Sequence, residues 1–219
     1  MIKAVIFDLD GTLSDSLESL AWSANAAMAA VDPALVPQPP ENFKFYAGDG
    51  ARVMVARCLA DAGDPEGRLL DQVMEVYPVY FKEGCLYHIR AYEGIQEALQ
   101  ALKARGIRLA VCSNKAQPNT EDVIHLLFGK DLFDMLVGAS PDLPRKPSPA
   151  GPLKVAQAFG LSPEEFLYVG DTNTDVRTGL AAGMHVVGVT WGFRPRTELE
   201  EAGAKDIIDR PEELLDRLS

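Results

Sequence analysis

Five short and almost continuously apolar runs punctuate the sequence. They lie at residues 3–7 (KAVIF), 107–112 (IRLAVC), 134–138 (DMLVG), 166–170 (FLYVG) and 185–190 (HVVGVT). Runs of this kind are typical of strands that are covered on both faces. Between the runs, helical periodicity is visible at 93–105, 149–159 and 175–182. This alternation predicts an α/β fold with a Rossmann-like parallel sheet and right-handed crossovers.

Residues 14–90 interrupt the alternation because they contain no β-type run. Asp15 and Glu18 resemble a capping box that would open a helix. A proline-rich loop follows at 33–40, and helical patterns resume at 51–62 and 66–83. We therefore predict an all-helical insert at 14–90, placed within a core formed by 1–13 and 91–219.

The charge balance restricts the classes of partner. The 32 acidic residues outnumber the 21 basic ones, which gives a formal net charge of -11. This charge argues against a nucleic acid or an anionic membrane as the main partner, because a protein that binds a phosphate-rich surface needs a basic surface of its own. No apolar run approaches the ~20 residues of a membrane span, and no signal peptide is visible. The three cysteines are expected to be free thiols in a reducing cytoplasm.

Polar residues follow four of the predicted strands at or near their ends. Asp8 and Asp10 come after the first run, and the other residues in such positions are Ser113, Asn114, Lys146, Asp171 and Asp175. In an open parallel sheet, ligands bind beyond the carboxyl ends of the strands. These side chains are therefore expected to converge on one edge of the sheet and form a site.

The residue types in this group indicate phosphoryl chemistry. Several crowded carboxylates repel one another and require a cation, and an all-oxygen ligand set suits Mg²⁺. One carboxylate can attack phosphorus to form an aspartyl-phosphate. A second one, two residues later, projects to the same side of an extended chain and can donate and accept a proton. Thr12, Ser113 and nearby N–H groups can bind phosphoryl oxygens, while Lys146 can neutralise developing negative charge.

Four segments resemble, in order and spacing, the motifs of the haloacid dehalogenase superfamily: FDLDGTLSDS, VCSNK, RKPSP and VGDTNTD. The resemblance extends from end to end of the chain, and the helical insert resembles the small cap domain of that family. Within the superfamily, the segments most similar to phosphoglycolate phosphatases lie at 46–55, 92–115 and 183–194.

The resemblance implies a role for each of the first two acids. Asp8 would be the nucleophile and a Mg²⁺ ligand. Asp10 would protonate the leaving alkoxide and then activate the hydrolytic water, and its backbone carbonyl would contact the metal. An acid at position 10 favours a phosphatase or a phosphomutase over the ion transporters and dehalogenases of the superfamily. Thr172 replaces a more usual serine, but it retains a hydroxyl.

The same resemblance implies roles for the later motifs. Ser113 and the backbone of Asn114 would hold the phosphoryl group. Lys146 would neutralise charge on Asp8 and on the phosphate. Asp171 would be a Mg²⁺ ligand, and Asp175 would support the metal directly or through water.

Alternative interpretations remain open at several positions. Ser113 and Asp175 could each be the N-cap of a helix. Gly48 and Gly50 precede a predicted helix, where their loop could bind an anion or merely form the helix start. Arg52 could contact a substrate carboxylate from the cap or be a surface charge.

The sequence thus predicts a cytoplasmic Mg²⁺-dependent phosphomonoester hydrolase that acts through an aspartyl-phosphate on a small phosphorylated metabolite. The resemblance implies 2-phosphoglycolate as the substrate. The alternatives are a phosphatase or phosphomutase for sugar phosphates, nucleotides or pyrophosphate, and a catalytically silent phosphate-binding module. The assembly is expected to be a monomer or a homodimer.

Overall fold

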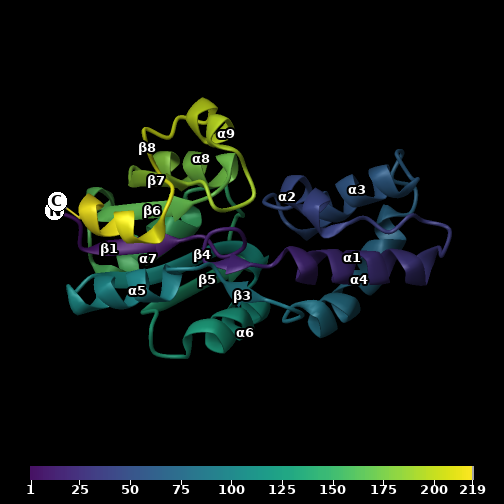
Figure 1. Cartoon of the computed structure of the whole chain (residues 1–219), viewed down its shortest axis with the longest axis horizontal. Helices are drawn as coiled ribbons and strands as arrows, with labels where there is room; N and C mark the ends of the chain where they lie inside the picture. Colours follow the sequence, from purple (N-terminus) through teal and green to yellow (C-terminus); the bar gives the residue numbers. More distant parts are fainter. Residues whose placement is uncertain (219) are drawn as a thin grey trace. The chain divides into compact units, whose positions relative to one another are not determined.

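The computed structural model describes residues 1–218 and divides the chain into two compact units (Figure 1). The α/β unit comprises Met1–Asp15 and the chain from Arg90 onward, and the helical unit comprises Ser16–Ile89. None of the helices within residues 1–218 has the length and apolar character that a membrane crossing requires.

A six-stranded parallel sheet forms the centre of the α/β unit, with the order β5-β4-β1-β6-β7-β8. Its strands are β1 (Ala4–Phe7), β4 (Arg108–Ala116), β5 (Met135–Ala139), β6 (Phe166–Gly170), β7 (His185–Val189) and β8 (Asp206–Ile208). The predicted α/β class is therefore confirmed, and each of the five predicted runs forms a strand. The edge strand β8 was not predicted.

The register of the sheet explains why the acids meet. Strand β1 is buried throughout and lies between β4 and β6. Phe7, its last residue, is level with Val111 of β4 and Val169 of β6. Because the strands are parallel, the residues that follow these three positions lie toward the same edge of the sheet, although β4 itself continues to Ala116.

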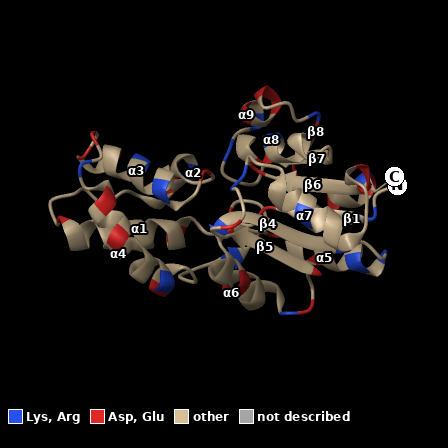
Figure 2. Ribbon diagram, turned by 180° about the vertical axis from the view of Figure 1, so that it is seen from behind, with Lys and Arg blue, Asp and Glu red and all other residues tan. Residues whose placement is uncertain are grey.

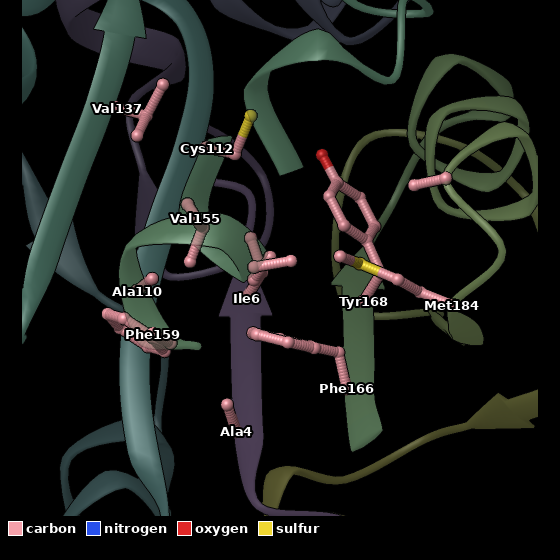
Figure 3. Packing of buried hydrophobic residues seen from close by; sticks show 12 residues of the cluster. Ala4, Ile6, Ala110, Cys112, Val137, Val155, Phe159, Phe166, Tyr168 and Met184 are labelled. Carbon is pink, nitrogen blue, oxygen red and sulfur yellow. The ribbon is translucent and has the colours of Figure 1, made fainter. Parts of the chain in front are cut away.

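Helices and short 3₁₀ turns connect the strands. They are α5 (Ile95–Ala104), α6 (Gln117–Phe128), α7 (Ala150–Phe159), η2 (Pro163–Glu165), α8 (Asn173–Ala181), α9 (Arg196–Glu201) and η3 (Pro211–Arg217). Val155 and Phe159 of α7 pack on one face of the sheet (Figure 3), where they meet alternate residues of three strands. Those strand residues are Ala4, Ile6, Ala110, Cys112, Phe166 and Tyr168. Burial of this apolar surface fixes the sheet beneath the site.

The helical unit is built from α1 (Leu17–Val31), η1 (Pro40–Asn42), α2 (Phe43–Tyr46), α3 (Ala51–Ala62) and α4 (Leu70–Gly84). Helices α1 and α4 approach closely at Gly84, where a Cβ atom would overlap the ring of Trp22. Figure 2 shows charged residues of both signs on the helices and loops of each unit, whereas strands β1 and β6 carry none.

Two local predictions in the first hundred residues were wrong. Asp15 and Glu18 do not form a capping box: helix α1 starts after Ser16, and the Asp15 carboxylate binds Arg90 at 2.7 Å. The segment 14–90 is also not purely helical at its ends. Strands β2 (Ser14–Asp15) and β3 (Arg90–Ala91) form a short antiparallel pair there.

Candidate active site

Three acidic side chains meet at the carboxyl edge of the sheet. Asp8 follows β1, Asp171 follows β6, and Asp175 lies in the first turn of α8. A carboxylate oxygen from each lies within 4.8 Å of the other two, and all three residues are buried. Residues separated by more than 160 positions in the sequence thus form one cluster.

Lys146 supplies a buried ammonium to this cluster. Its Nζ lies 2.7 Å from Asp8 Oδ1 and 2.7 Å from Asp175 Oδ1. The backbone N–H of Leu9 also donates to Asp8 Oδ1, at 2.7 Å. Lys146 and this N–H therefore fix one oxygen of Asp8.

Asp171 is held by donors from two other segments. The Thr12 hydroxyl donates to Asp171 Oδ1 at 2.8 Å, and the Phe193 N–H donates to Oδ2 at 2.8 Å. Gly11 and Gly192 pack directly against this carboxylate, and a Cβ atom at either position would overlap Asp171. The hydroxyl of Thr12, expected to bind phosphate, is thus engaged with a carboxylate.

Asp175 has a structural role as well as a place in the cluster. Thr172 is the N-cap of α8, and Asp175 Oδ2 accepts hydrogen bonds from the Thr172 N–H at 3.1 Å and its hydroxyl at 2.7 Å. The alternative in which Asp175 is itself the N-cap was therefore wrong, because it occupies the third helical position of the capping box. Its Oδ1 remains directed to Lys146.

The cluster carries more negative than positive charge. Burial, followed by the charge of Asp175, raises the pKa of the Asp8 carboxyl well above its ordinary value. The same two causes raise the pKa of Asp171 to about 7. Burial by itself would lower the pKa of Lys146, but the charges of Asp175 and Asp8 raise it above its usual value. One ammonium does not balance three carboxylates, so a bound cation would relieve the repulsion.

The second motif lies on β4, beside the loop that carries Lys146. Asn114 exchanges hydrogen bonds with the backbone of Lys146: the Lys146 N–H donates to Asn114 Oδ1 at 2.9 Å, and Asn114 Nδ2 donates to the Lys146 carbonyl at 3.2 Å. Ser113 is buried and its hydroxyl oxygen accepts the Lys115 N–H at 3.1 Å. The N-cap interpretation of Ser113 was wrong, since Ala116 occupies the N-cap position of α6.

Sequence reasoning missed one charged residue near the site. Lys115 is buried on β4, and its Nζ lies 2.6 Å from Asp10 Oδ1. Among the residues from 1 to 218, the cluster suited to a metal contains Asp8, Asp171 and Asp175 but not the carboxylate of Asp10.

The remaining candidate residues belong to the helical unit. Gly48 and Gly50 both adopt positive φ angles, 113° and 92°, and Gly50 is the N-cap of α3. Arg52 lies in the first turn of α3 and pairs with Asp71 at 2.5 Å, with both side chains exposed.

The donor set fits a hard divalent cation. All three clustered groups are carboxylates, the ligands that Mg²⁺ takes in proteins, usually in combination with water and substrate phosphate oxygens. Cysteine and histidine, which favour zinc and other softer ions, are absent from this cluster of described residues.

Comparison with known proteins supports this chemistry. A model of the haloacid dehalogenase-like hydrolase family matches residues 5–189. A phosphoglycolate phosphatase of Haemophilus influenzae is 36% identical over 97% of this chain and 96% of its own length. One of Nitrosospira multiformis is 34% identical, over 94% and 91%. The crystal structure of a predicted phosphoglycolate phosphatase from Haemophilus somnus 129pt superimposes with a TM-score of 0.89 at 28% identity, covering 100% of this chain and 98% of that one.

Proposed function

Because this chain belongs to the haloacid dehalogenase-like hydrolases and is a phosphatase of that type, we propose that it hydrolyses a small phosphomonoester, with 2-phosphoglycolate as the favoured substrate. One observation carries the proposal. Lys146 joins Asp8 to Asp175 at 2.7 Å each, with Asp171 in the same cluster. The substrate assignment follows from the relatives in Haemophilus and Nitrosospira. Both are named phosphoglycolate phosphatase, and the similarity to this chain covers nearly their full lengths.

Asp8 is the proposed nucleophile. Its Oδ1 is fixed by Lys146 and by the Leu9 N–H, which leaves Oδ2 for attack on phosphorus. Attack forms the aspartyl-phosphate bond and breaks the bond between phosphorus and the ester oxygen. Lys146 offsets the negative charge that gathers on the transferring group.

Asp10 is the proposed acid and base. It gives its proton to the departing alkoxide in the first step. The resulting carboxylate then takes a proton from water as that water attacks phosphorus. Cleavage of the aspartyl-phosphate releases inorganic phosphate and restores Asp8 as a carboxylate and Asp10 as an acid.

The residues proposed to bind the phosphoryl group lie at the end of β4. The Ser113 hydroxyl and the backbone N–H of Asn114 are the proposed donors. The side chain of Asn114 adds an indirect contribution, since its two hydrogen bonds hold the backbone of Lys146. Thr12 is proposed to act through Asp171, whose carboxylate accepts its hydroxyl hydrogen.

Mg²⁺ is the proposed cofactor, with Asp8, Asp171, Asp175 and the backbone carbonyl of Asp10 as candidate ligands. When bound, it would neutralise the carboxylates and the phosphoryl oxygens. The three carboxylates face one ammonium, that of Lys146, which supports this assignment. The pKa values of Asp8 and Asp171 are raised first by burial and then by the charge of Asp175.

Residues 14–90 are the proposed cap, which would select the substrate rather than perform the chemistry. Gly48, Gly50 and Arg52 are its candidate contacts. Exchange of Arg52 for alanine is expected to raise KM for a phosphomonoester that bears a carboxylate. The KM for a phosphomonoester without a carboxylate should not change. Arg68 offers a matched control, because it is also an exposed arginine of the helical unit with an acidic partner.

The proposed setting is the cytoplasm. The three cysteines, Cys58, Cys85 and Cys112, are buried and form no disulfide in the structure.

A phosphate-release assay tests the function. The full-length protein is incubated with 2-phosphoglycolate, sugar phosphates, nucleotides and pyrophosphate, each with Mg²⁺ and with EDTA. We expect release that requires Mg²⁺ and is fastest for 2-phosphoglycolate. Preference for a sugar phosphate would reassign the substrate, and dependence on a bisphosphate activator would indicate a mutase. No release from any ester, with Mg²⁺ still bound, would leave only the silent binding module.

A further inference from the structure

Lys115 is a buried cation that the proposed mechanism does not use. Its side chain is only 2% exposed, and its Nζ lies 2.6 Å from Asp10 Oδ1. Lysine side chains are almost never buried to this extent unless they are paired, because desolvation of the ammonium is costly. The pairing joins residues 105 positions apart.

The strand that carries Lys115 is irregular at this point. Cys112 pairs with Val137 of β5, yet Ala116 pairs with Ala139, so β4 holds two more residues than its neighbour between these pairs. Such bulges re-aim side chains and are frequent beside active sites. The backbone of Lys115 is tied on both sides: its N–H donates to Ser113 Oγ at 3.1 Å, and its carbonyl accepts the Thr120 hydroxyl at 3.1 Å.

The other partner, Asp10, is fixed at one oxygen only. Lys115 holds Oδ1, while Oδ2 receives no hydrogen bond from a residue within 1–218. The Asp10 side chain is 18% exposed, whereas the side chain of Lys115 is 2% exposed. Asp10 also lies two residues after Asp8, the proposed nucleophile, in the segment that leaves the end of β1.

We propose that Lys115 is a positioning residue for Asp10: it holds one carboxylate oxygen so that the other can exchange protons with the leaving group and the hydrolytic water. This inference rests on the proposed function. Proton transfer requires the acid within hydrogen-bond reach of its partner, and a displacement of about 1 Å can cost roughly a hundredfold in rate. Without Lys115, the Asp10 carboxylate could rotate away from the leaving oxygen.

The inference predicts a dependence on the leaving group. An alkoxide such as glycolate leaves poorly unless it is protonated, whereas 4-nitrophenolate leaves without an acid. The value of kcat/KM reports the steps up to formation of the aspartyl-phosphate. A displaced Asp10 should therefore lower kcat/KM strongly for 2-phosphoglycolate and weakly for 4-nitrophenyl phosphate.

The test compares Lys115→Met with the wild-type protein on both esters in the presence of Mg²⁺. We expect kcat/KM to fall by about 10- to 100-fold for 2-phosphoglycolate and by less than about threefold for 4-nitrophenyl phosphate. The first loss is smaller than the roughly 10²–10⁴-fold that general acid catalysis contributes, because Asp10 is displaced and not removed. Lys115→Gln, which keeps a hydrogen-bond donor, should show a smaller effect in the same direction. It also provides a second variant if the methionine variant does not fold.

Two further variants separate positioning from stability. Lys103→Met removes another Lys–Asp pair of the α/β unit, in which Lys103 Nζ lies 3.0 Å from Asp134 Oδ2. This variant should leave both kcat/KM values unchanged. Asp10→Asn should by itself lower kcat/KM more for 2-phosphoglycolate than for 4-nitrophenyl phosphate. Adding Lys115→Met to this variant should lower kcat/KM little further, because the two residues act as a unit.

The outcomes are distinguishable. Equal losses on both esters in the Lys115 variants, or no loss on either, would overturn the inference while the phosphatase assignment stands. A wild-type protein that releases phosphate from neither ester would remove the proposed function and the inference with it.

Discussion

The Nζ atom of Lys146 lies 2.7 Å from Oδ1 of Asp8, and both side chains are buried. The same ammonium also binds Asp175. One cation therefore holds together two carboxylates that would otherwise repel each other. Under the proposed function, stability and catalysis would therefore be coupled at Lys146.

Replacement of Lys146 by methionine is expected to abolish phosphate release and to destabilise the metal-free protein by about 3–5 kcal/mol, because it leaves buried carboxylates unpaired. Urea unfolding in EDTA measures the loss. Lys103→Met, which breaks a partly exposed pair, should cost at most about 1 kcal/mol. Similar costs for the two variants would contradict a special role for the buried ammonium.

Asp8→Asn is expected to lower turnover by at least about a thousandfold, since it removes the proposed nucleophile. The amide oxygen can still accept hydrogen bonds from Leu9 and Lys146, so the fold should persist. Removal of one negative charge should stabilise the metal-free protein by about 1 kcal/mol, or roughly 2–4 °C in melting temperature. Turnover at the wild-type rate would end the nucleophile assignment.

The effect of Mg²⁺ on stability should grow with pH. The pKa of Asp171 is raised from 3.8 to about 7 in the folded protein, and that of Asp8 is also raised, in both cases first by burial. Over that interval the folded state holds protons that the unfolded chain has released. Stability of the metal-free protein should therefore fall as pH rises from about 4 to about 7.

Melting temperatures in Mg²⁺ and in EDTA at several pH values test this dependence. We expect a small difference near pH 5 and a larger one at pH 8, where the carboxylates are ionised and a cation can compensate them. A difference that is constant across the series would show that the acidic cluster does not control metal binding.

Gly192→Ala should disrupt the site without changing any charge. A Cβ atom there would overlap the Cβ of Asp171 and the carbonyl oxygen of Gly11, so backbone must move. We expect a destabilisation of about 1–3 kcal/mol and a large loss of kcat, measured by thermal unfolding and phosphate release. Gly188→Ala is the control, because its Cβ would meet only side-chain atoms, Leu199 Cδ1 at 3.1 Å and Ile207 Cγ1 at 3.3 Å, and no backbone atom at overlap distance. Its activity should change little.

The sheet and much of the site could be predicted from sequence because both depend on local patterns. An apolar run as short as 3–7 favours a buried strand over a helix, and acids directly after such a strand lie at its carboxyl end. Strand β8 escaped notice because three residues at a sheet edge provide no periodicity.

Other features depend on partners that are distant in the sequence. Asp15 has the local pattern of a helix cap, but Arg90, 75 residues later, provides a stronger partner for its carboxylate. Nothing in the local sequence distinguishes Lys115 from a solvent-exposed lysine. Its burial is explained by the bulge in β4 and by the pairing with Asp10. Phe193 contributes through its backbone N–H, which no side-chain pattern reveals.

The central place of β1 in the sheet also constrains how the protein is made. Strand β1 is synthesised before both of its neighbours in the sheet, and one of them, β6, ends only at residue 170. The nascent chain must therefore leave one edge of β1 unpaired until β6 has been synthesised. A chain that is arrested before β6 lacks Asp171 and Asp175 and cannot assemble the acidic cluster, so it would be a substrate for chaperones and proteases.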